Sequence, residues 1–431
     1  MTRLVVIADD FTGALDTGVQ FAEYNASIQV LPGEAVTADD FEGDGETALV
    51  IDAETRRLTW EQAYQVTRRL VEKATAANIP YIYIKTDSAL RGNIGSALKA
   101  TLDASGRDFL AFVPAFPAMN RITKDGVHFI GGVPVNESEF GRDPFESVRS
   151  PFVPDLFTGL DVPVRVFADG AACTAEDKGI GIFDAQSDAE MQSIAGRLHR
   201  QDRLHLAAGC AGFASMLPEY IGFAKKRERL PAVMSGDRIL VVSGSLNDIT
   251  RRQVEHGERM GYRRVVLTPP QRMEPDYLDK PEGAEWLNSL KSLLREPGSI
   301  MFDTGFSESQ AVRRYMDTHG IDRESARITI SQTLGIFLKR LLTLPEATGY
   351  MPLIIGGDTL FGFIQQLKAP CISPLCELVP GVVLFSIEID GKTKCLLSKS
   401  GGFGDENLFE QVSAKIKLIQ AGGNAYERIQ A

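Results

Sequence analysis

The chain has 431 residues, too many for one ordinary hydrophobic core, so two domains are expected. Its hydrophobic share of 44% and charged share of 24% are typical of a soluble globular protein. The net charge of −11 argues against nucleic acid as a partner, because contacts to a phosphate backbone need a basic surface.

The start of the sequence and its cysteines bear on the compartment. Met1-Thr2-Arg3 leads into an apolar run too short for a signal peptide or a membrane span, so we expect a cytoplasmic protein with no membrane partner. The five cysteines contain no CxxC pair, which is typical of reduced thiols. The five histidines form no HxH or HExxH set, which argues against a zinc site.

The first stretch of the chain combines a strand pattern with an acidic loop. Residues 4–8 are apolar and mostly β-branched, and two adjacent carboxylates, Asp9 and Asp10, follow them. An apolar helical pattern then runs to about residue 22, which predicts a strand, a loop and a helix. Ligands of open α/β sheets bind just outside the carboxyl ends of the strands, so this loop is a candidate site. Asp10 is the primary candidate, and Asp9 is expected to cap the helix.

Strand and helix patterns alternate through the rest of the first half. This alternation predicts βαβ units with a parallel sheet. The expected strands are 27–30, 47–51, 81–84, 109–113, 164–167, 181–184 and 205–208, and the expected helices are 60–77 and 94–102.

Residues 115–160 interrupt this alternation with a segment rich in Gly, Pro and Asn. A hairpin is expected at 125–135. The aromatic residues of the segment argue against disorder, and so long an irregular stretch is usually functional. We interpret it as a segment that covers the substrate. Its histidine, His128, is expected to be a structural hydrogen-bonding residue rather than a catalyst.

The second half begins after a charged stretch at 224–231 that is typical of a linker. Strands are expected at 238–242, 264–267, 299–302, 353–355, 382–389 and 393–397. The sequence therefore predicts two α/β domains with largely parallel sheets, 1–228 and 236–431, with the active site in the cleft between them.

Polar clusters follow three of the expected strands in the first half, and parallel strands bring their carboxyl ends to one edge. A carboxylate there can accept a hydroxyl proton, and an arginine can clamp a substrate carboxylate. The alternative is that each residue is a cap or a turn residue, or that Arg91 is solvated. The candidate residues are Asp9, Asp10, Arg56, Lys85, Thr86, Asp87, Ser88 and, at the start of the next helix, Arg91.

Three glycine-containing loops follow expected strands in the second half. Glycine lets backbone N–H groups approach a polyphosphate without obstruction, so the three loops together favour a nucleotide. No GxxxxGK[ST] motif is present, and no strand-linked GxGxxG supports a dinucleotide. The candidate residues are Ser243, Ser245, Gly356, Gly357, Asp358, Thr359, Gly401 and Gly402.

Several of these motifs resemble those of the four-carbon acid-sugar kinases. The similar stretches are Ile7–Ala14, Lys85–Asn93, the run from Pro114 to Pro144, and the GGDT and SGGFGD loops of the second half. The resemblance implies an acid-sugar-binding domain followed by a nucleotide-binding domain. It also implies an ATP- and Mg²⁺-dependent kinase that phosphorylates the terminal hydroxyl of threonate, erythronate or 3-oxo-tetronate.

By this resemblance, Asp10, Arg56 and residues 85–88 hold the sugar acid, while Ser243, residues 356–359 and Gly401 hold ATP. The family's usual GGET motif is GGDT here, with Asp358 one methylene shorter. We expect Arg56 and Lys85 to bind the carboxylate end and Asp10 or Asp87 to accept the hydroxyl proton. The sequence does not identify the metal ligands.

Three readings besides threonate or erythronate kinase remain open at this stage. The stretch Asp16-Thr17-Gly18-Val19-Gln20 looks more like the threonate and erythronate kinases than like the 3-oxo-tetronate branch, which is the first alternative. From other classes, a NAD-dependent sugar-acid dehydrogenase and a non-catalytic sugar-acid sensor also fit part of the pattern. A homo-oligomer is compatible with the sequence.

Overall fold

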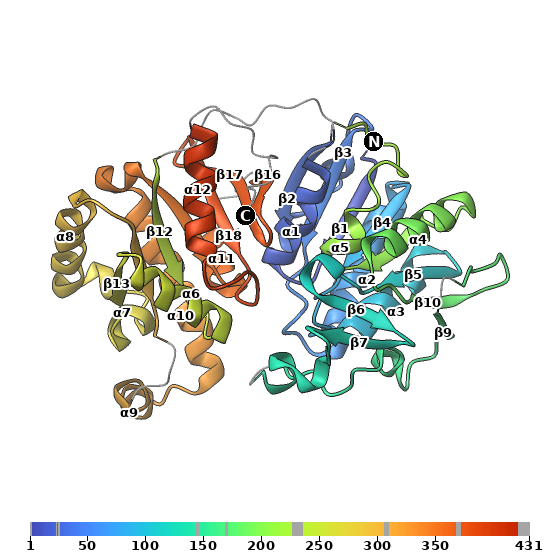
Figure 1. Ribbon diagram of the computed structural model, residues 1–431, viewed down its shortest axis with the longest axis horizontal. Helices are drawn as coiled ribbons and strands as arrows, with labels where there is room; N and C mark the ends of the chain where they lie inside the picture. Colours follow the sequence, from blue (N-terminus) through green and yellow to red (C-terminus); the bar gives the residue numbers. More distant parts are fainter. Residues whose placement is uncertain are drawn as a thin grey trace. The chain divides into compact units, whose positions relative to one another are not determined.

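A computed structural model describes residues 2–22, 24, 26–143, 146–168, 171–225, 236–305, 310–367 and 372–420. The chain divides into two compact units, Met1–Glu228 and Arg229–Ala431 (Figure 1). Each unit is an α/β layer structure with a largely parallel sheet, so the predicted fold class is confirmed. Residues 226–231 of the expected linker lie outside the described residues.

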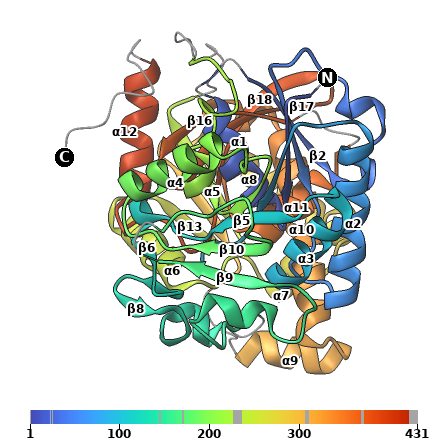
Figure 2. The ribbon, with the colours of Figure 1, turned by 90° about the vertical axis from the view of Figure 1, so that its right-hand side faces the viewer.

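The main sheet of the first unit has eight strands among the described residues, in the order β2-β3-β1-β4-β11-β5-β10-β9, and all the pairings between them are parallel. Figure 2 shows one end of this sheet, with β5, β10 and the edge strand β9 in succession. Its elements are β1 (Leu4–Ala8), α1 (Phe11–Ala22), β2 (Ser27–Pro32), β3 (Thr47–Asp52), α2 (Trp60–Ala76), β4 (Tyr81–Lys85), α3 (Ile94–Ser105), β5 (Phe109–Val113), β9 (Val164–Phe167), β10 (Gly179–Phe183), α4 (Asp188–Arg200), β11 (Leu206–Gly209) and α5 (Ala211–Ala214).

The register of the central strands brings the polar loops together. Every residue of β1 is buried, as expected for a parallel strand covered on both faces. Ala8, its last residue, is aligned with Asp52 of β3 and with Lys85 of β4. The loops after these three strands therefore begin side by side at one edge of the sheet.

The segment after β5 forms a small antiparallel sheet of β6 (Arg121–Lys124), β7 (Val127–Ile130) and β8 (Val133–Pro134). The expected hairpin at 125–135 is confirmed by β7 and β8, and β6 adds a third strand. Both turns have two residues with positive φ, 52° and 72° at Asp125-Gly126 and 58° and 83° at Gly131-Gly132. Such turns match the twist of hairpin strands.

The second unit has the strand order β13-β14-β12-β15-β18-β17-β16. Strands β13, β14, β12, β15 and β18 pair with their neighbours in parallel. Strands β18, β17 and β16 pair antiparallel. Its elements are β12 (Arg238–Ser243), α6 (Asp248–Arg259), β13 (Arg263–Val266), α7 (Pro269–Met273), α8 (Pro281–Arg295), β14 (Ile300–Asp303), α9 (Gln310–His319), α10 (Arg323–Leu342), β15 (Tyr350–Ile355), α11 (Gly357–Ile364), β16 (Ile372–Val379), β17 (Val382–Ile389), β18 (Lys392–Lys399) and α12 (Leu408–Gln420).

Strand β16 was not expected from the sequence. Pro374 lies within it, and proline is normally confined to edges and irregular positions of a sheet because it lacks an N–H donor. The pairing of β16 with β17 is indeed irregular, with register shifts between Pro374 and Cys376 and between Glu377 and Val379. The proline is thus accommodated by local breaks in the ladder.

Helices α10 and α11 approach each other closely through glycine. A Cβ atom on Gly362 would lie 2.0 Å from the carbonyl oxygen of Ser331, and one on Gly335 would lie 2.1 Å from the carbonyl oxygen of Gly362. This backbone contact holds α11, which begins two residues after β15, against α10. None of the helices in the described ranges is long and apolar enough to cross a membrane.

Candidate active site

The acidic loop after β1 holds two aspartates with different roles. Asp10 caps α1, because its Oδ1 accepts a hydrogen bond of 2.8 Å from the Gly13 amide and its Oδ2 accepts one of 2.8 Å from the Thr12 hydroxyl. Asp9 makes no such contact. The expectation that Asp9 caps the helix is therefore wrong, because the chain turns into α1 one residue later.

Arg56, in the loop after β3, is the central cation of the first unit's cluster. Its Nε donates to Asp9 Oδ2 at 2.7 Å and its Nη1 donates to Asp10 Oδ2 at 2.7 Å. Its Nη2 lies 3.6 Å from Asp87 Oδ1. The three carboxylates raise the pKa of this buried guanidinium although burial alone would lower it, so Arg56 stays charged.

Asn93 and Gly92 hold the Arg56 loop from the side of α3. The Asn93 side-chain amide donates to the carbonyl oxygens of Thr55 and Leu58 at 3.0 and 2.7 Å. Gly92 has a φ of 83°, and a Cβ there would lie 2.9 Å from Arg56 Cγ. Gly92 and Asn93, which the sequence marks only as part of the Lys85–Asn93 motif, thus position the central arginine.

Lys85, the last residue of β4, and the three residues after it lie beside the same loop, and all four are buried. Lys85 Nζ lies 3.7 Å from Asp9 Oδ1. Asp87 forms a bidentate ion pair with Arg91, whose Nε and Nη2 are 2.9 and 3.0 Å from the two carboxylate oxygens. The Thr86 hydroxyl has no hydrogen-bond partner within the described residues.

The electrostatics separate the carboxylates of the cluster. Burial alone would raise the pKa of Asp10 and of Asp87, but Arg56 and Lys85 lower the pKa of Asp10, and Arg91 and Arg56 hold the pKa of Asp87 well below its usual range. Burial raises the pKa of Asp9, only partly offset by Arg56 and Lys85. Burial and the nearby Asp10 carboxylate raise the pKa of Glu54 to about 7. The site therefore contains both firmly ionised and readily protonated acids.

The segment with the small sheet supplies Arg121, which the sequence patterns did not identify, and His128, which they did. Arg121 of β6 donates a hydrogen bond to the Ser88 hydroxyl, and its guanidinium lies 5.3 Å from the ring centre of Phe140. His128 of β7 lies between the Ser88 carbonyl oxygen and the Thr123 hydroxyl, 3.0 Å from each. Burial lowers the pKa of His128 to about 4, so it is neutral and structural, as expected.

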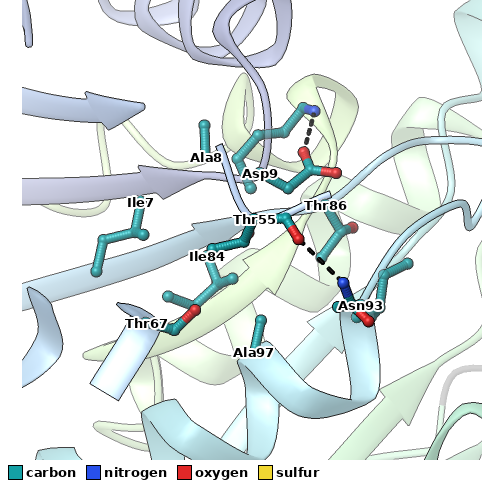
Figure 3. Close-up of a pocket in the computed structure, with 11 residues that line it drawn as sticks. Ile7, Ala8, Asp9, Thr55, Thr67, Ile84, Thr86, Asn93 and Ala97 are labelled. Carbon is teal, nitrogen blue, oxygen red and sulfur yellow. Dashed lines mark hydrogen bonds and ion pairs between the residues drawn. The ribbon is translucent and has the colours of Figure 1, made fainter. Parts of the chain in front are cut away.

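A narrow pocket opens beside this cluster between β1, β4, α2 and α3 (Figure 3). Figure 3 shows Asp9 at the end of β1 and the Asn93 amide on the Thr55 carbonyl. Asp9 Oδ1 is buried without a hydrogen-bond donor among the described residues. The pocket is lined by Ile7, Ala8, Asp9, Thr55, Thr67, Ile84, Lys85, Thr86, Asn93, Ile94 and Ala97.

In the second unit, the three predicted loops meet. Ser243 of β12, Ile355 of β15 and Lys399 of β18 are aligned at the ends of neighbouring parallel strands. The Gly244 amide donates to the Thr359 hydroxyl at 3.1 Å, which joins the first loop to the second. A Cβ on Gly401 would lie 2.5 Å from Ser245 Oγ, so the third loop also touches the first.

The geometry of these loops fits a polyphosphate. Gly356 has a φ of 102° and precedes the eight-residue helix α11, which begins at Gly357. Unpaired N–H groups at a helix N-terminus favour anions. The close contact of Gly401 with Ser245 leaves no room for a side chain, and Gly402 continues the same loop. No cluster of three or more metal-binding side chains occurs in the described part of the chain.

The Asp358 side chain turns toward α10. Its Oδ2 accepts a hydrogen bond of 2.8 Å from Arg327 Nε, and its carbonyl oxygen accepts one of 2.5 Å from the Ser331 hydroxyl. The carboxylate is thus engaged in an ion pair that ties α11 to α10. Among the expected nucleotide residues, Asp358 thus has its charged group in an ion pair within the unit.

An α/β unit with a cluster of buried acids and bases, together with a second α/β unit of glycine loops, is compatible with a nucleotide-dependent transferase. Comparison with known proteins identifies the family. A family of sugar-binding N-terminal domains matches residues 4–217, and a family of nucleotide-binding C-terminal domains matches residues 240–409. The chain belongs to the four-carbon acid sugar kinase family, and the predicted membership is confirmed.

Characterised relatives cover nearly the whole chain. A D-threonate kinase of Salmonella typhimurium is 30% identical over 423 residues, which are 94% of this chain and 96% of that protein. A D-erythronate kinase of Heliobacterium modesticaldum is 30% identical and covers 88% of this chain and 89% of its own length. A 3-oxo-tetronate kinase of Brucella melitensis is 26% identical, with 94% of each chain covered. The protein is therefore a kinase of a four-carbon sugar acid, and not a dehydrogenase or a sensor.

Solved structures share the fold. A crystal structure from Salmonella typhimurium, provisionally described as a tRNA synthase, has a TM-score of 0.73 at 21% identity and covers 95% of this chain and 98% of its own. A Haemophilus influenzae protein of the DUF1537 family has a TM-score of 0.66 at 22% identity and covers 95% of this chain and 99% of its own.

Proposed function

We propose that the protein transfers the γ-phosphoryl group of MgATP to the terminal hydroxyl of D-threonate or D-erythronate, giving the 4-phosphate. The observation that carries the acceptor half is the buried cluster in which Arg56 joins Asp9 and Asp10. The two relatives at 30% identity are a D-threonate kinase and a D-erythronate kinase, which supports these acids over the 3-oxo compound. The stretch at 16–20 supports the same choice.

In this proposal Arg56 and Lys85 bind the substrate carboxylate, with Arg91 as a further cation. Lys85 is the best placed, because its ammonium lies 3.7 Å from Asp9, beyond an ordinary hydrogen bond. Its donors can therefore turn to a ligand without breaking a short contact. The unpartnered Thr86 hydroxyl in the same pocket suits a hydroxyl of the acid.

Asp10 is the proposed proton acceptor. Asp87 is less suited to that role, because two Arg91 nitrogens and the amides of Ala89 and Arg91 already occupy its oxygens. Among the described residues, Gly13 is the one donor to Asp10 Oδ1, which leaves an acceptor position for the substrate hydroxyl. Its lowered pKa keeps it ionised at neutral pH. Asp87 then acts by positioning Arg91.

The second unit is proposed to hold ATP through Ser243, Ser245 and the backbone of the loops at 356–359 and 401–402. Such transfer depends on positioning and charge neutralisation rather than on covalent chemistry by the protein. Mg²⁺ would supply part of that neutralisation, and it commonly binds through substrate phosphates and few protein ligands. Functionally, we assign residues 1–228 to the acid and 236–431 to the nucleotide.

A coupled assay of ADP release with a panel of four-carbon acids tests this proposal. The panel contains both enantiomers of threonate and erythronate and a 3-oxo-tetronate, and mass spectrometry of the product locates the phosphate. The expected result is the highest kcat/KM with D-threonate or D-erythronate and phosphate on C4. A preference for the 3-oxo acid would establish the alternative substrate. If no acid of the panel supported ADP release, the proposal would be overturned.

A further inference from the structure

Lys399, the last residue of β18, is a buried cation that the reaction as described above does not use. Its side chain is among the largest fully buried ones in the protein, with 0% exposed. Its Nζ donates one hydrogen bond, of 3.1 Å, to the Gly401 carbonyl oxygen. No carboxylate within the described residues forms an ion pair with it. Buried charges in proteins are normally paired, so this lysine lacks a counter-ion.

Its position connects Lys399 to all three glycine loops. Its own carbonyl oxygen accepts a hydrogen bond of 3.0 Å from the Gly356 amide, at the start of the second loop. Its ammonium reaches the third loop at Gly401. In the sheet it lies level with Ile355, which in turn lies level with Ser243 at the first loop. An anion bound by these loops would therefore lie close to the lysine.

The contact with Gly401 also orients the loop. The Gly401 carbonyl oxygen accepts a second hydrogen bond, of 3.0 Å, from the Thr250 hydroxyl. In a planar trans peptide the carbonyl and the following N–H point in opposite directions. With the Gly401 carbonyl turned toward Lys399 and Thr250, the N–H of Gly402 points away from them, and it has no hydrogen-bond acceptor within the described residues. It is a donor for a phosphate.

Burial alone lowers the pKa of Lys399 to about 7, and no other charged group contributes to that shift. The groups around its Nζ are neutral: the Gly401 carbonyl, and beyond it the Thr250 and Ser245 hydroxyls. Above this pKa the free protein holds a neutral amine. A nearby anion favours the charged form, so a bound polyphosphate would draw a proton from solvent.

We infer that Lys399 is a nucleotide-site residue that holds the Gly401 loop and supplies the buried positive charge that the ATP phosphates neutralise. Nucleotide binding then adds one solvent proton to the Lys399 amine. This inference rests on the proposed ATP site of the second unit. Lys399 is a positioning residue and counter-charge, not a group that exchanges protons with the substrate hydroxyl.

Calorimetry of MgADP binding in buffers with different ionisation enthalpies measures this proton uptake directly. At about pH 8, where the nucleotide is fully ionised, the wild-type protein should take up close to one proton per nucleotide, and at about pH 6 little or none. Lys399→Arg should bind without proton uptake, because arginine stays charged. Lys399→Met should bind at least about tenfold more weakly, with no proton uptake.

The control measurements separate folding from function. Lys399→Met removes an unpaired buried charge, so its thermal stability without ligand should be equal or higher, and its binding of D-threonate unchanged. Thr250→Val keeps the lysine but removes the second contact to Gly401, so it should weaken MgADP binding while proton uptake persists. Thr250→Val also provides the test if Lys399→Met does not fold.

The outcomes distinguish this inference from the proposed function. If the wild-type protein binds neither MgADP nor MgATP, the nucleotide site itself is wrong. If it binds them, but proton uptake and affinity are the same in Lys399→Met, the role of Lys399 is refuted and the kinase site stands. Equal proton uptake in wild type and Lys399→Arg would likewise assign the proton to another group.

Discussion

The Gly13 amide donates a hydrogen bond of 2.8 Å to Oδ1 of Asp10, so the residue proposed to accept the substrate proton is also the N-cap of α1. A cap is held in one rotamer by the backbone of its own helix. The positive end of the helix also favours its negative charge. The arrangement holds the carboxylate in place before substrate arrives, and it makes the effect of substitutions predictable.

Asp10→Asn should retain the fold and lose turnover. Asparagine can keep the cap through its side-chain oxygen but loses the charge that pairs with Arg56, so the protein should still fold with a lower melting temperature. Removal of a positioned proton acceptor typically costs about 10²- to 10⁴-fold in kcat. Steady-state kinetics and a thermal unfolding scan measure both effects. Turnover near that of the wild type would remove Asp10 from the catalytic role.

Gly13→Ala should also lower activity more than stability. The added Cβ would lie 2.4 Å from Lys85 Nζ and 2.5 Å from Asp10 Oδ1, so both groups must move. Alanine is the better helix residue by about 0.5–1 kcal/mol, which offsets part of the strain. We expect a loss of at least about tenfold in kcat/KM for the acid with a nearly unchanged melting temperature. Unchanged kinetics would show that the space above Gly13 is not used by substrate.

Gly401→Ala should act on the nucleotide alone. Its Cβ would lie 2.5 Å from Ser245 Oγ, which accepts hydrogen bonds from the Asn247 amide and the Thr250 hydroxyl and cannot easily move. The apparent KM for ATP should rise by about tenfold or more, while calorimetry should show wild-type affinity for the sugar acid. Weaker acid binding of the same size would indicate a general loss of structure instead.

Glu54 should make stability fall as pH rises. Its pKa of about 7 in the folded protein exceeds the ordinary value of 4.5, so between these values the folded state holds a proton that the unfolded chain releases. The stability from this proton is complete below about pH 4.5 and is lost as pH rises through about 7. Glu54→Gln keeps the neutral form and should be more stable than wild type above pH 7, on the order of 1 kcal/mol, and equal to it near pH 4.

Chemical unfolding at several pH values measures the difference. The substitution Glu42→Gln, at an exposed glutamate of the same unit, is the control and should show little dependence on pH. A constant difference between Glu54→Gln and wild type across the range would mean that Glu54 ionises normally in the folded protein.

The sequence was most informative where strands end. The apolar runs of β1, β3 and β4 are short and clearly bounded, so the loops that follow them could be placed at one edge of a parallel sheet. It was least informative about β16, which was not expected, and about Arg121. Arg121 reaches Ser88 from a segment whose packing no local pattern reveals.

The amino-acid sequence by itself determined the α/β class, the polar strand ends and the family, because hydrophobic periodicity and motif spacing are local properties of the chain. The tertiary structure decided which aspartate caps α1, which carboxylates Arg56 joins, and that Lys399 is buried without a counter-ion. The contacts of Arg56 and the burial of Lys399 depend on residues far apart in the sequence, and the cap depends on the residue at which the chain turns into α1. Burial and opposing charges set their protonation, and both arise only when the sheets are formed.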